Sequence, residues 1–145
     1  MKKEGATSDL LDRYYAEQWI GIGGGTTVAT RAISLLRTAG YLRFDLFGVD
    51  CCWIGDVHHA MPQPENDRDK WTLVHAGVRD KPETTRTFRV SHWQLKQAED
   101  LLTMMKVNGA HFTLASHGDG LFTHLLYALG SDDVDSLSLT EKESQ

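Results

Sequence analysis

The chain has 145 residues, 41% of them hydrophobic, and is long enough to bury one core without disulfide or metal cross-links. Its 20 acidic and 15 basic residues give a formal net charge of -5, which argues against binding duplex DNA or RNA through the phosphates. It has no apolar run of bilayer length and starts with the polar stretch MKKEGATSDLLDRYY, so we expect a cytoplasmic protein with no membrane partner.

The first half of the chain predicts two helices and two strands. A helix is expected over residues 8–18, followed by a strand in the apolar run 19–22. From Thr26 onward, apolar residues recur at helical spacing until Gly40 ends the pattern. Residues 42–49, LRFDLFGV, predict the next strand. Strand, glycine turn, helix and strand in this order imply a parallel strand pair with a right-handed crossover.

The second half continues the alternation of strands and helices after a long irregular loop. Residues 71–76 and 85–90 alternate in polarity, which predicts an antiparallel hairpin. A helix is expected over residues 92–106, then a strand over 110–115 and a helix over 121–129. This order of elements is typical of the α/β class.

The last residues differ in composition from the rest. The segment 131–145, SDDVDSLSLTEKESQ, is acidic and contains many serines, which favours a flexible tail. We therefore expect one compact domain over residues 1–130 with this tail attached.

Three features fall where predicted strands end: a glycine turn, an aspartate and a second glycine turn. The residues are Gly23, Gly24, Gly25, Thr26 and Thr27, then Asp50, then His117, Gly118, Asp119 and Gly120. Ligands bind at this edge of open parallel sheets because loops and helix N-termini gather there. The N–H groups at a helix N-terminus favour an anion. The first turn lacks the GK[ST] of a phosphate loop, so its threonines could contact a phosphate or only cap the helix.

Four of the side chains have a chemical interpretation, and two of them, Asp50 and Asp119, also have a structural one. Asp50 could bind a magnesium ion or a ribose hydroxyl, or cap the next turn. His117 could act as a general acid or base, or bind phosphate when protonated. Asp119 offers an anion beside it, or the N-cap of the following helix. Trp53 follows Asp50 closely enough to stack on the base of a ligand.

The chain resembles the hydroxymethylpterin pyrophosphokinase-like family in three segments, namely GGGTTVATRAISLLRTAGYLRFDLFGVDCCW, FRVSHWQLKQAEDLL and HGDGLFTHLL. That family includes the central domain of motility accessory factor glycosyltransferases. The resemblance spans residues 20–126 and implies a Rossmann-like three-layer sandwich with a mostly parallel sheet, into which the antiparallel hairpin would be inserted. It also implies nucleotide chemistry, either pyrophosphoryl transfer from ATP with magnesium or sugar transfer from a nucleotide sugar.

The resemblance also assigns residues and exposes a gap. Gly24, Gly25, Thr26 and Thr27 match the glycine turn of the family, Asp50 matches the strand-ending aspartate, and His117 to Gly120 match the late turn. The preceding half of the family, with its GPSL-like turn and early aspartate pair, has no counterpart in MKKEGATSDLLDRYYAEQ. The chain looks like the second half alone, either a fragment of an enzyme or a small descendant that kept ligand recognition. Self-association would then cover the exposed sheet edge.

Three functions remain open at this point. The first is a module that binds a nucleotide or nucleotide-derived molecule, including one that sequesters a signalling nucleotide. The second is a magnesium-dependent transferase of pyrophosphoryl or glycosyl groups, with Asp50 on the metal and His117 in proton transfer. The third is a structural or interaction protein in which each glycine only makes a turn.

Overall fold

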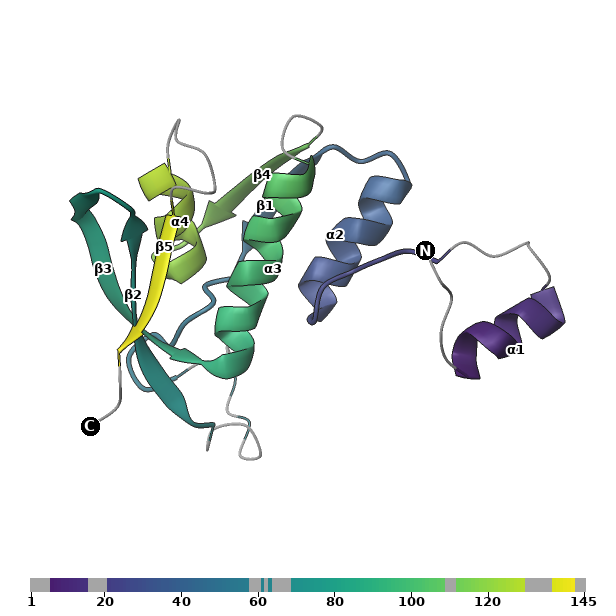
Figure 1. Cartoon of the computed structure of the whole chain (residues 1–145), viewed down its shortest axis with the longest axis horizontal. Coiled ribbons are helices and arrows are strands. Elements are labelled where there is room, and N and C mark those ends of the chain that lie inside the picture. Colours follow the sequence, from purple (N-terminus) through teal and green to yellow (C-terminus); the bar gives the residue numbers. More distant parts are fainter. Residues whose placement is uncertain are drawn as a thin grey trace.

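A computed structural model of the chain describes residues 6–15, 21–57, 61, 63, 69–108, 112–129 and 137–142. These residues form helices and strands that alternate along much of the chain (Figure 1). In order they are α1 (Ala6–Tyr15), α2 (Val28–Thr38), β1 (Arg43–Phe47), β2 (Trp71–Val78), β3 (Lys81–Ser91), α3 (His92–Asn108), β4 (Thr113–His117), α4 (Leu121–Leu129) and β5 (Leu137–Lys142). The expected positions of α2, β1, α3, β4 and α4 are confirmed, with small shifts at the ends.

The strands make two small sheets, so the predicted Rossmann-like sandwich with a mostly parallel sheet is wrong. One sheet holds only β1 and β4, paired in parallel from Arg43 opposite Thr113 to Phe47 opposite His117. The other is antiparallel, in the order β3-β2-β5, and contains the predicted hairpin of β2 and β3. The parallel sheet stays small because Gly21 and Ile22, from the strand expected over 19–22, belong to no strand; Trp19 and Ile20 lie outside the described residues.

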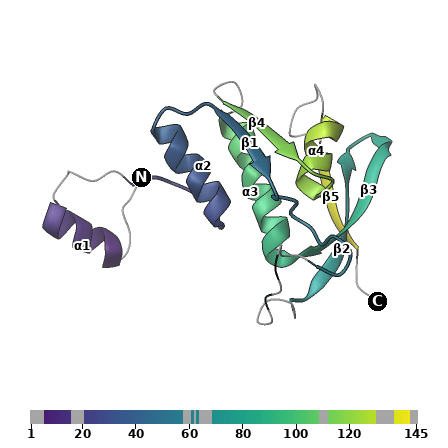
Figure 2. The same ribbon diagram turned by 180° about the vertical axis from the view of Figure 1, so that it is seen from behind.

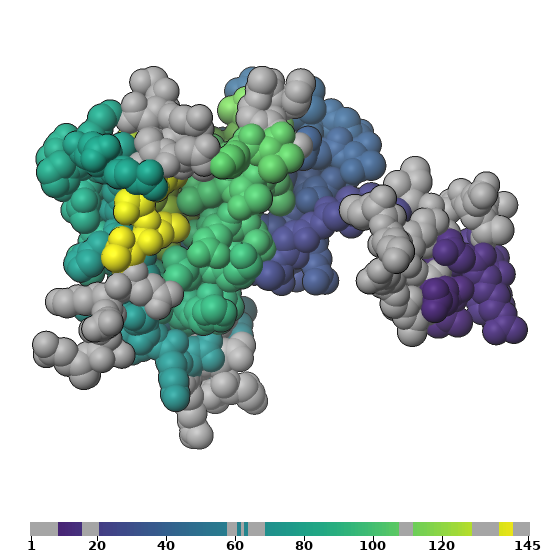
Figure 3. Space-filling model, in the orientation of Figure 1, coloured from purple at the N-terminus to yellow at the C-terminus, as the bar shows by residue number. Residues whose placement is uncertain are grey.

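Residues 137–142 correct the expectation of a flexible tail over 131–145. They form β5, which pairs along β2 from Leu137 opposite Val78 to Lys142 opposite Leu73. Leu137 and Leu139 pack against the core, and β5 lies beside α3 on the surface (Figure 3). The tail adds as a strand because β2 offers a free edge and because its two leucines, at alternating positions, both face the core.

Helix α4 joins the two sheets, because it contacts both β2 and β4. Thr123 and Ser116 of β4 share a hydrogen bond of 2.8 Å between their hydroxyls. On the other side, Nε2 of His124 lies 3.2 Å from the carbonyl oxygen of Ala76 and 2.9 Å from that of Thr84. The core around α4 contains side chains that are fully buried: Phe122, Leu121, Leu125, Leu101, Val74 and Val90.

Helix α3 lies between α2 and the antiparallel sheet, whereas α1 stands apart at the end of the N-terminal arm (Figures 1 and 2). The structure begins α1 at Ala6 rather than at the expected residue 8, and residues 16–18 of the expected helix lie outside the described ones. None of the described helices is long and apolar enough to cross a membrane.

Candidate functional site

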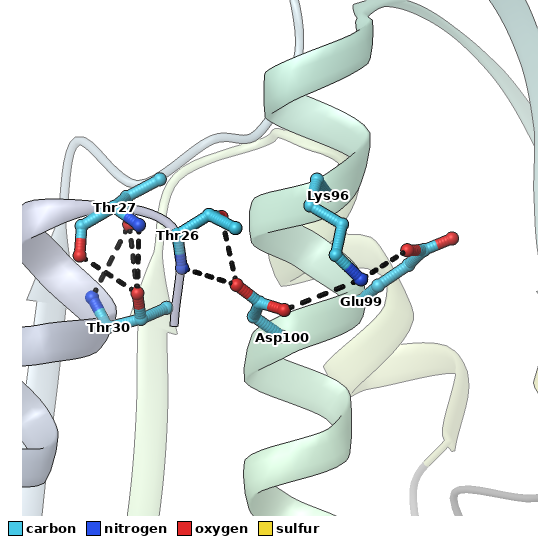
Figure 4. A network of polar contacts seen from close by, with 6 residues as sticks. All are labelled: Thr26, Thr27, Thr30, Lys96, Glu99 and Asp100. Carbon is cyan, nitrogen blue, oxygen red and sulfur yellow. Dashed lines mark hydrogen bonds and ion pairs between the residues drawn. The ribbon is translucent and has the colours of Figure 1, made fainter. Parts of the chain in front are cut away.

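The glycine turn before α2 already holds an anion, which is the carboxylate of Asp100 on α3 (Figure 4). The backbone N–H of Thr26 donates to Oδ2 of Asp100 at 2.6 Å, and the Thr26 hydroxyl donates to the same oxygen at 2.9 Å. Thr27 is the N-cap of α2 and exchanges hydrogen bonds with Thr30. The position predicted for a phosphate is therefore filled from within the chain.

The charge of Asp100 is stabilised by these contacts. Burial raises the pKa of Asp100, but the two hydrogen bonds from Thr26 and the nearby Lys96 ammonium outweigh it and hold the pKa below its ordinary value. A Cβ added at Gly25 would lie 2.5 Å from Oγ1 of Thr30 and 2.6 Å from Oδ2 of Asp100. Gly25 is thus required for the close approach of the turn to α3.

Asp50 and the late glycine turn do come together, as expected from the neighbouring carboxyl ends of β1 and β4. A Cβ added at Gly118 would lie 2.7 Å from Oδ1 of Asp50, and one at Gly120 would lie 2.5 Å from Cα of Asp50. The N–H of Phe122 donates to the carbonyl oxygen of Asp50 at 3.3 Å. The two glycines therefore let the turn pack directly on Asp50.

Asp119 and His117 from the same turn point to other partners. Asp119 accepts from Arg86 at 2.8 and 3.4 Å instead of capping α4, and this hydrogen bond with its charge holds the pKa of Asp119 below the ordinary value. Nε2 of His117 lies 2.8 Å from Oδ1 of Asp45, and its ring stacks on Phe47 at 4.4 Å. Neither side chain lines the pocket that contains Asp50.

Trp53 interacts with other side chains of the protein. Its indole N–H donates to Oγ of Ser91 at 2.9 Å, and the guanidinium of Arg89 lies 4.4 Å from its ring centre. The same guanidinium lies 4.8 Å from the ring centre of Trp71, so Arg89 contacts both indoles. Trp71 and Trp93 are 49% and 37% exposed.

A pocket of about 270 Å³ lies between the loop after β1 and the first turns of α3. Residues from both sides line it, including Asp50, Cys52, Ile54, Trp93, Gln94 and Gln97. None of the residues of the glycine turn before α2 is among them. Of the three features predicted to share one edge, the structure thus brings only Asp50 and the late turn together.

Two glutamines of α3 were not foreseen as site residues. Gln94 is 2% exposed, and its Oε1 accepts from the N–H of Ser91 at 2.9 Å, which caps the helix. Gln97 is 8% exposed, and within the described part of the chain its amide makes no hydrogen bond. Gln97 lines the pocket, and its amide is not among the buried unpaired side-chain atoms of the described residues, which are Nε of Arg37 and Nε of Arg89. The amide therefore opens into the pocket, where it can donate to and accept from a ligand. Their spacing of three residues on α3 was the only signal in the sequence.

The pocket is apolar apart from these amides and one charge. The ionisable side chains among its lining residues are Asp50 and two cysteines, Cys51 and Cys52. Burial raises the pKa of both thiols, which keeps them protonated. Among the described residues no three His, Cys, Asp or Glu side chains gather to hold a metal ion. Asp119 pairs with Arg86, which leaves Asp50 as the single carboxylate of the pocket. Magnesium is usually held by one or two carboxylates together with phosphates and waters, so the magnesium site at Asp50 stays a prediction.

Comparison of the chain with models of protein families, with curated proteins and with solved structures finds no match. The resemblance to the hydroxymethylpterin pyrophosphokinase-like family therefore stays a prediction from three sequence segments. What the site can bind is therefore argued from its own residues alone.

Proposed function

We propose that this protein binds a small nucleotide-derived molecule and that the pocket beside Asp50 receives its base. The observation that supports the proposal is the amide of Gln97, which lines the pocket and makes no hydrogen bond within the described residues. An amide offers a donor and an acceptor side by side, which match the edge of a nucleobase.

The size and charge of the pocket support a base rather than a phosphate. A volume of about 270 Å³ is just below the usual range for whole ligands, roughly 300–1,000 Å³, and suits one ring system. The carboxylate of Asp50 is the only formal charge there, and it would repel a phosphate while accepting from an amino or hydroxyl group.

The phosphates of such a ligand would lie outside the pocket. An adjoining hollow of about 260 Å³ shares Cys52 and Ile54 with it. Two arginines, Arg86 and Arg89, line this hollow together with Asp119, which pairs with Arg86 at 2.8 Å. Arginine is the side chain best suited to phosphate. We therefore place the phosphates toward these two arginines and away from the glycine turn, where Asp100 already occupies the helix N-terminus.

Gln97→Leu is expected to weaken ligand binding roughly tenfold while leaving the free protein as stable or more stable. Leucine removes the unpaired amide but keeps the side-chain volume. The measurement is native mass spectrometry and calorimetric titration with nucleosides, nucleotides, cyclic nucleotides and nucleotide sugars, together with thermal unfolding of the free protein.

Gln94→Leu is the matched control, because this amide accepts from Ser91 and its loss should lower the melting temperature of the free protein. The proposal fails if no compound of the panel is retained. It also fails if Gln97→Leu binds every retained compound as tightly as the unchanged chain does.

A further inference from the structure

Strand β1 has one edge to which no other strand of the described chain is bonded. It pairs with β4 alone, and the two strands form a sheet of their own (Figure 2). The N–H of Thr113 donates to the carbonyl oxygen of Leu42, just before β1. Since successive residues of a strand direct their backbone groups to opposite edges, the even-numbered residues of β1 face β4. Arg43, Asp45 and Phe47 therefore present their N–H and C=O groups at the free edge.

The side chains at this edge carry exposed charges of opposite sign. Arg43, Asp45 and Phe47 lie on the outer face of β1, whereas Phe44 is buried in the core. Arg43 makes no ion pair within the described residues. The side chain of Asp45 is 62% exposed; its Oδ1 lies 2.8 Å from Nε2 of His117, and its second oxygen can accept from a further donor. Both charges are thus available to a strand that is added at the edge.

One antiparallel register of β1 against a second β1 places opposite charges together. Strands bond through residues whose backbone groups face each other, so the odd-numbered residues of β1 must oppose odd-numbered ones. Arg43 opposite Arg43, or Asp45 opposite Asp45, would set like charges against each other, which destabilises a sheet. Arg43 opposite Asp45 instead gives an attractive pair, and two-fold symmetry gives this pair twice.

The same register also pairs apolar residues on both faces of the sheet. On the outer face it brings Tyr41, which is 60% exposed, opposite Phe47, which is 72% exposed. On the inner face it brings Leu42 opposite Leu46 and Phe44 opposite itself. Aromatic pairs across strands stabilise a sheet, so the apolar residues favour the register that the charges favour.

We propose that β1 of one copy pairs with β1 of a second copy, antiparallel and with Phe44 at the two-fold axis. A two-fold contact needs a surface that is complementary to itself, and this register supplies one. The contact joins two sheets of two strands into one sheet of four, and it gives partners to the backbone groups at the free edge. It specifies the edge that self-association was expected to cover, and it is independent of the ligand proposed above.

The test measures the mass of the full-length protein without ligand over a range of concentrations, by analytical ultracentrifugation and native mass spectrometry. A contact between strands of 5 residues is smaller than the roughly 1,200–2,000 Å² of stable interfaces, so we expect a dimer Kd of about 10 µM. The mass should rise from 16.3 kDa toward twice that value as the concentration increases. A mass that stays at one copy up to about 500 µM would overturn the proposal, including a chain that covers this edge with another of its own segments.

Charge reversal at the edge tests the register. Arg43→Asp and Asp45→Arg should each weaken the dimer about tenfold or more, since each replaces two attractive pairs by two repulsive ones. The double variant, which exchanges the two charges, and an equimolar mixture of the two single variants should both recover the dimer. Arg79→Asp, at an exposed residue between β2 and β3, is the matched control and should leave the Kd unchanged. Single variants that dimerise like the unchanged chain, or a double variant and a mixture that stay monomeric, would overturn the proposal.

Amide hydrogen exchange tests the same contact without any substitution. At concentrations well above the Kd, the N–H groups of Arg43 and Asp45 should exchange about tenfold more slowly than in the dilute protein. The N–H of Phe44 faces β4 in the single chain and should change less. Exchange rates at Arg43 and Asp45 that do not depend on concentration would overturn the proposal, whether or not the charge variants fold.

Discussion

Gly120→Ala is expected to destabilise the protein by about 3 kcal/mol, the upper part of the range for forced overpacking. A Cβ at this position would lie 2.5 Å from both Cα and Cβ of Asp50 and closer still to its carbonyl oxygen. These are mostly backbone atoms, so the clash can be relieved only by moving the end of β1 away from the late turn. Thermal unfolding should show a melting temperature lower by roughly 10 °C.

Gly23→Ala is the control for this experiment, because a Cβ there meets nothing within 4 Å. Its melting temperature should stay close to that of the unchanged protein. The Gly120→Ala chain should also lose affinity for any ligand of the pocket, since Asp50 moves with the strand end. An unchanged melting temperature for Gly120→Ala would contradict the close packing of the late turn on Asp50.

Asp100→Ala is expected to cost about 2–3 kcal/mol, because it leaves two donors of Thr26 without their charged acceptor. Glu99→Ala is the matched control: Glu99 pairs with the same Lys96 at 3.2 Å, yet it is 46% exposed and should contribute less than about 1 kcal/mol. Urea unfolding of both variants gives the comparison. Equal losses would show that the carboxylate of Asp100 does not hold the glycine turn.

The contribution of Asp100 should depend on pH with a definite sign. Its pKa in the folded protein lies below the ordinary value, so the stabilisation is complete above that value and is lost as the pH falls through the folded pKa. Asp100→Asn should flatten this part of the profile of stability against pH, measured between about pH 5 and pH 2. A profile that Asp100→Asn leaves unchanged would contradict the assignment of the charge.

Local patterns were sufficient for the helices α2, α3 and α4 and for the hairpin of β2 and β3. Their signals are short-range, namely helical periodicity, alternation and caps. Neither the strand β5 nor the pairing of β1 with β4 could be predicted in this way. Both depend on which strand edge a distant segment of the chain reaches. The strand expected over 19–22 followed from its apolar residues, and the parallel pair inferred from it was wrong, because the structure shows β4 beside β1.

The candidate site, too, could be predicted only in part from local sequence patterns. The contact of Asp50 with the late turn follows from two parallel strands ending side by side, once those strands are paired. The occupant of the glycine turn, Asp100, lies 74 positions from Thr26, and no local pattern links them. In the sequence, Gln97 resembles any polar residue on the outer side of an amphipathic helix. It lines a pocket because the loop after β1 packs next to it.

The pairing of β1 with β4 also has a consequence for the order of folding. Arg43 pairs with Thr113, 70 positions away, whereas β2 and β3 are joined by a tight turn at residues 79–80. Because closing a long loop costs entropy before any contact repays it, we expect the hairpin to form early and the parallel pair to close late. In stopped-flow refolding, competence to bind a ligand beside Asp50 should therefore be the last signal to recover.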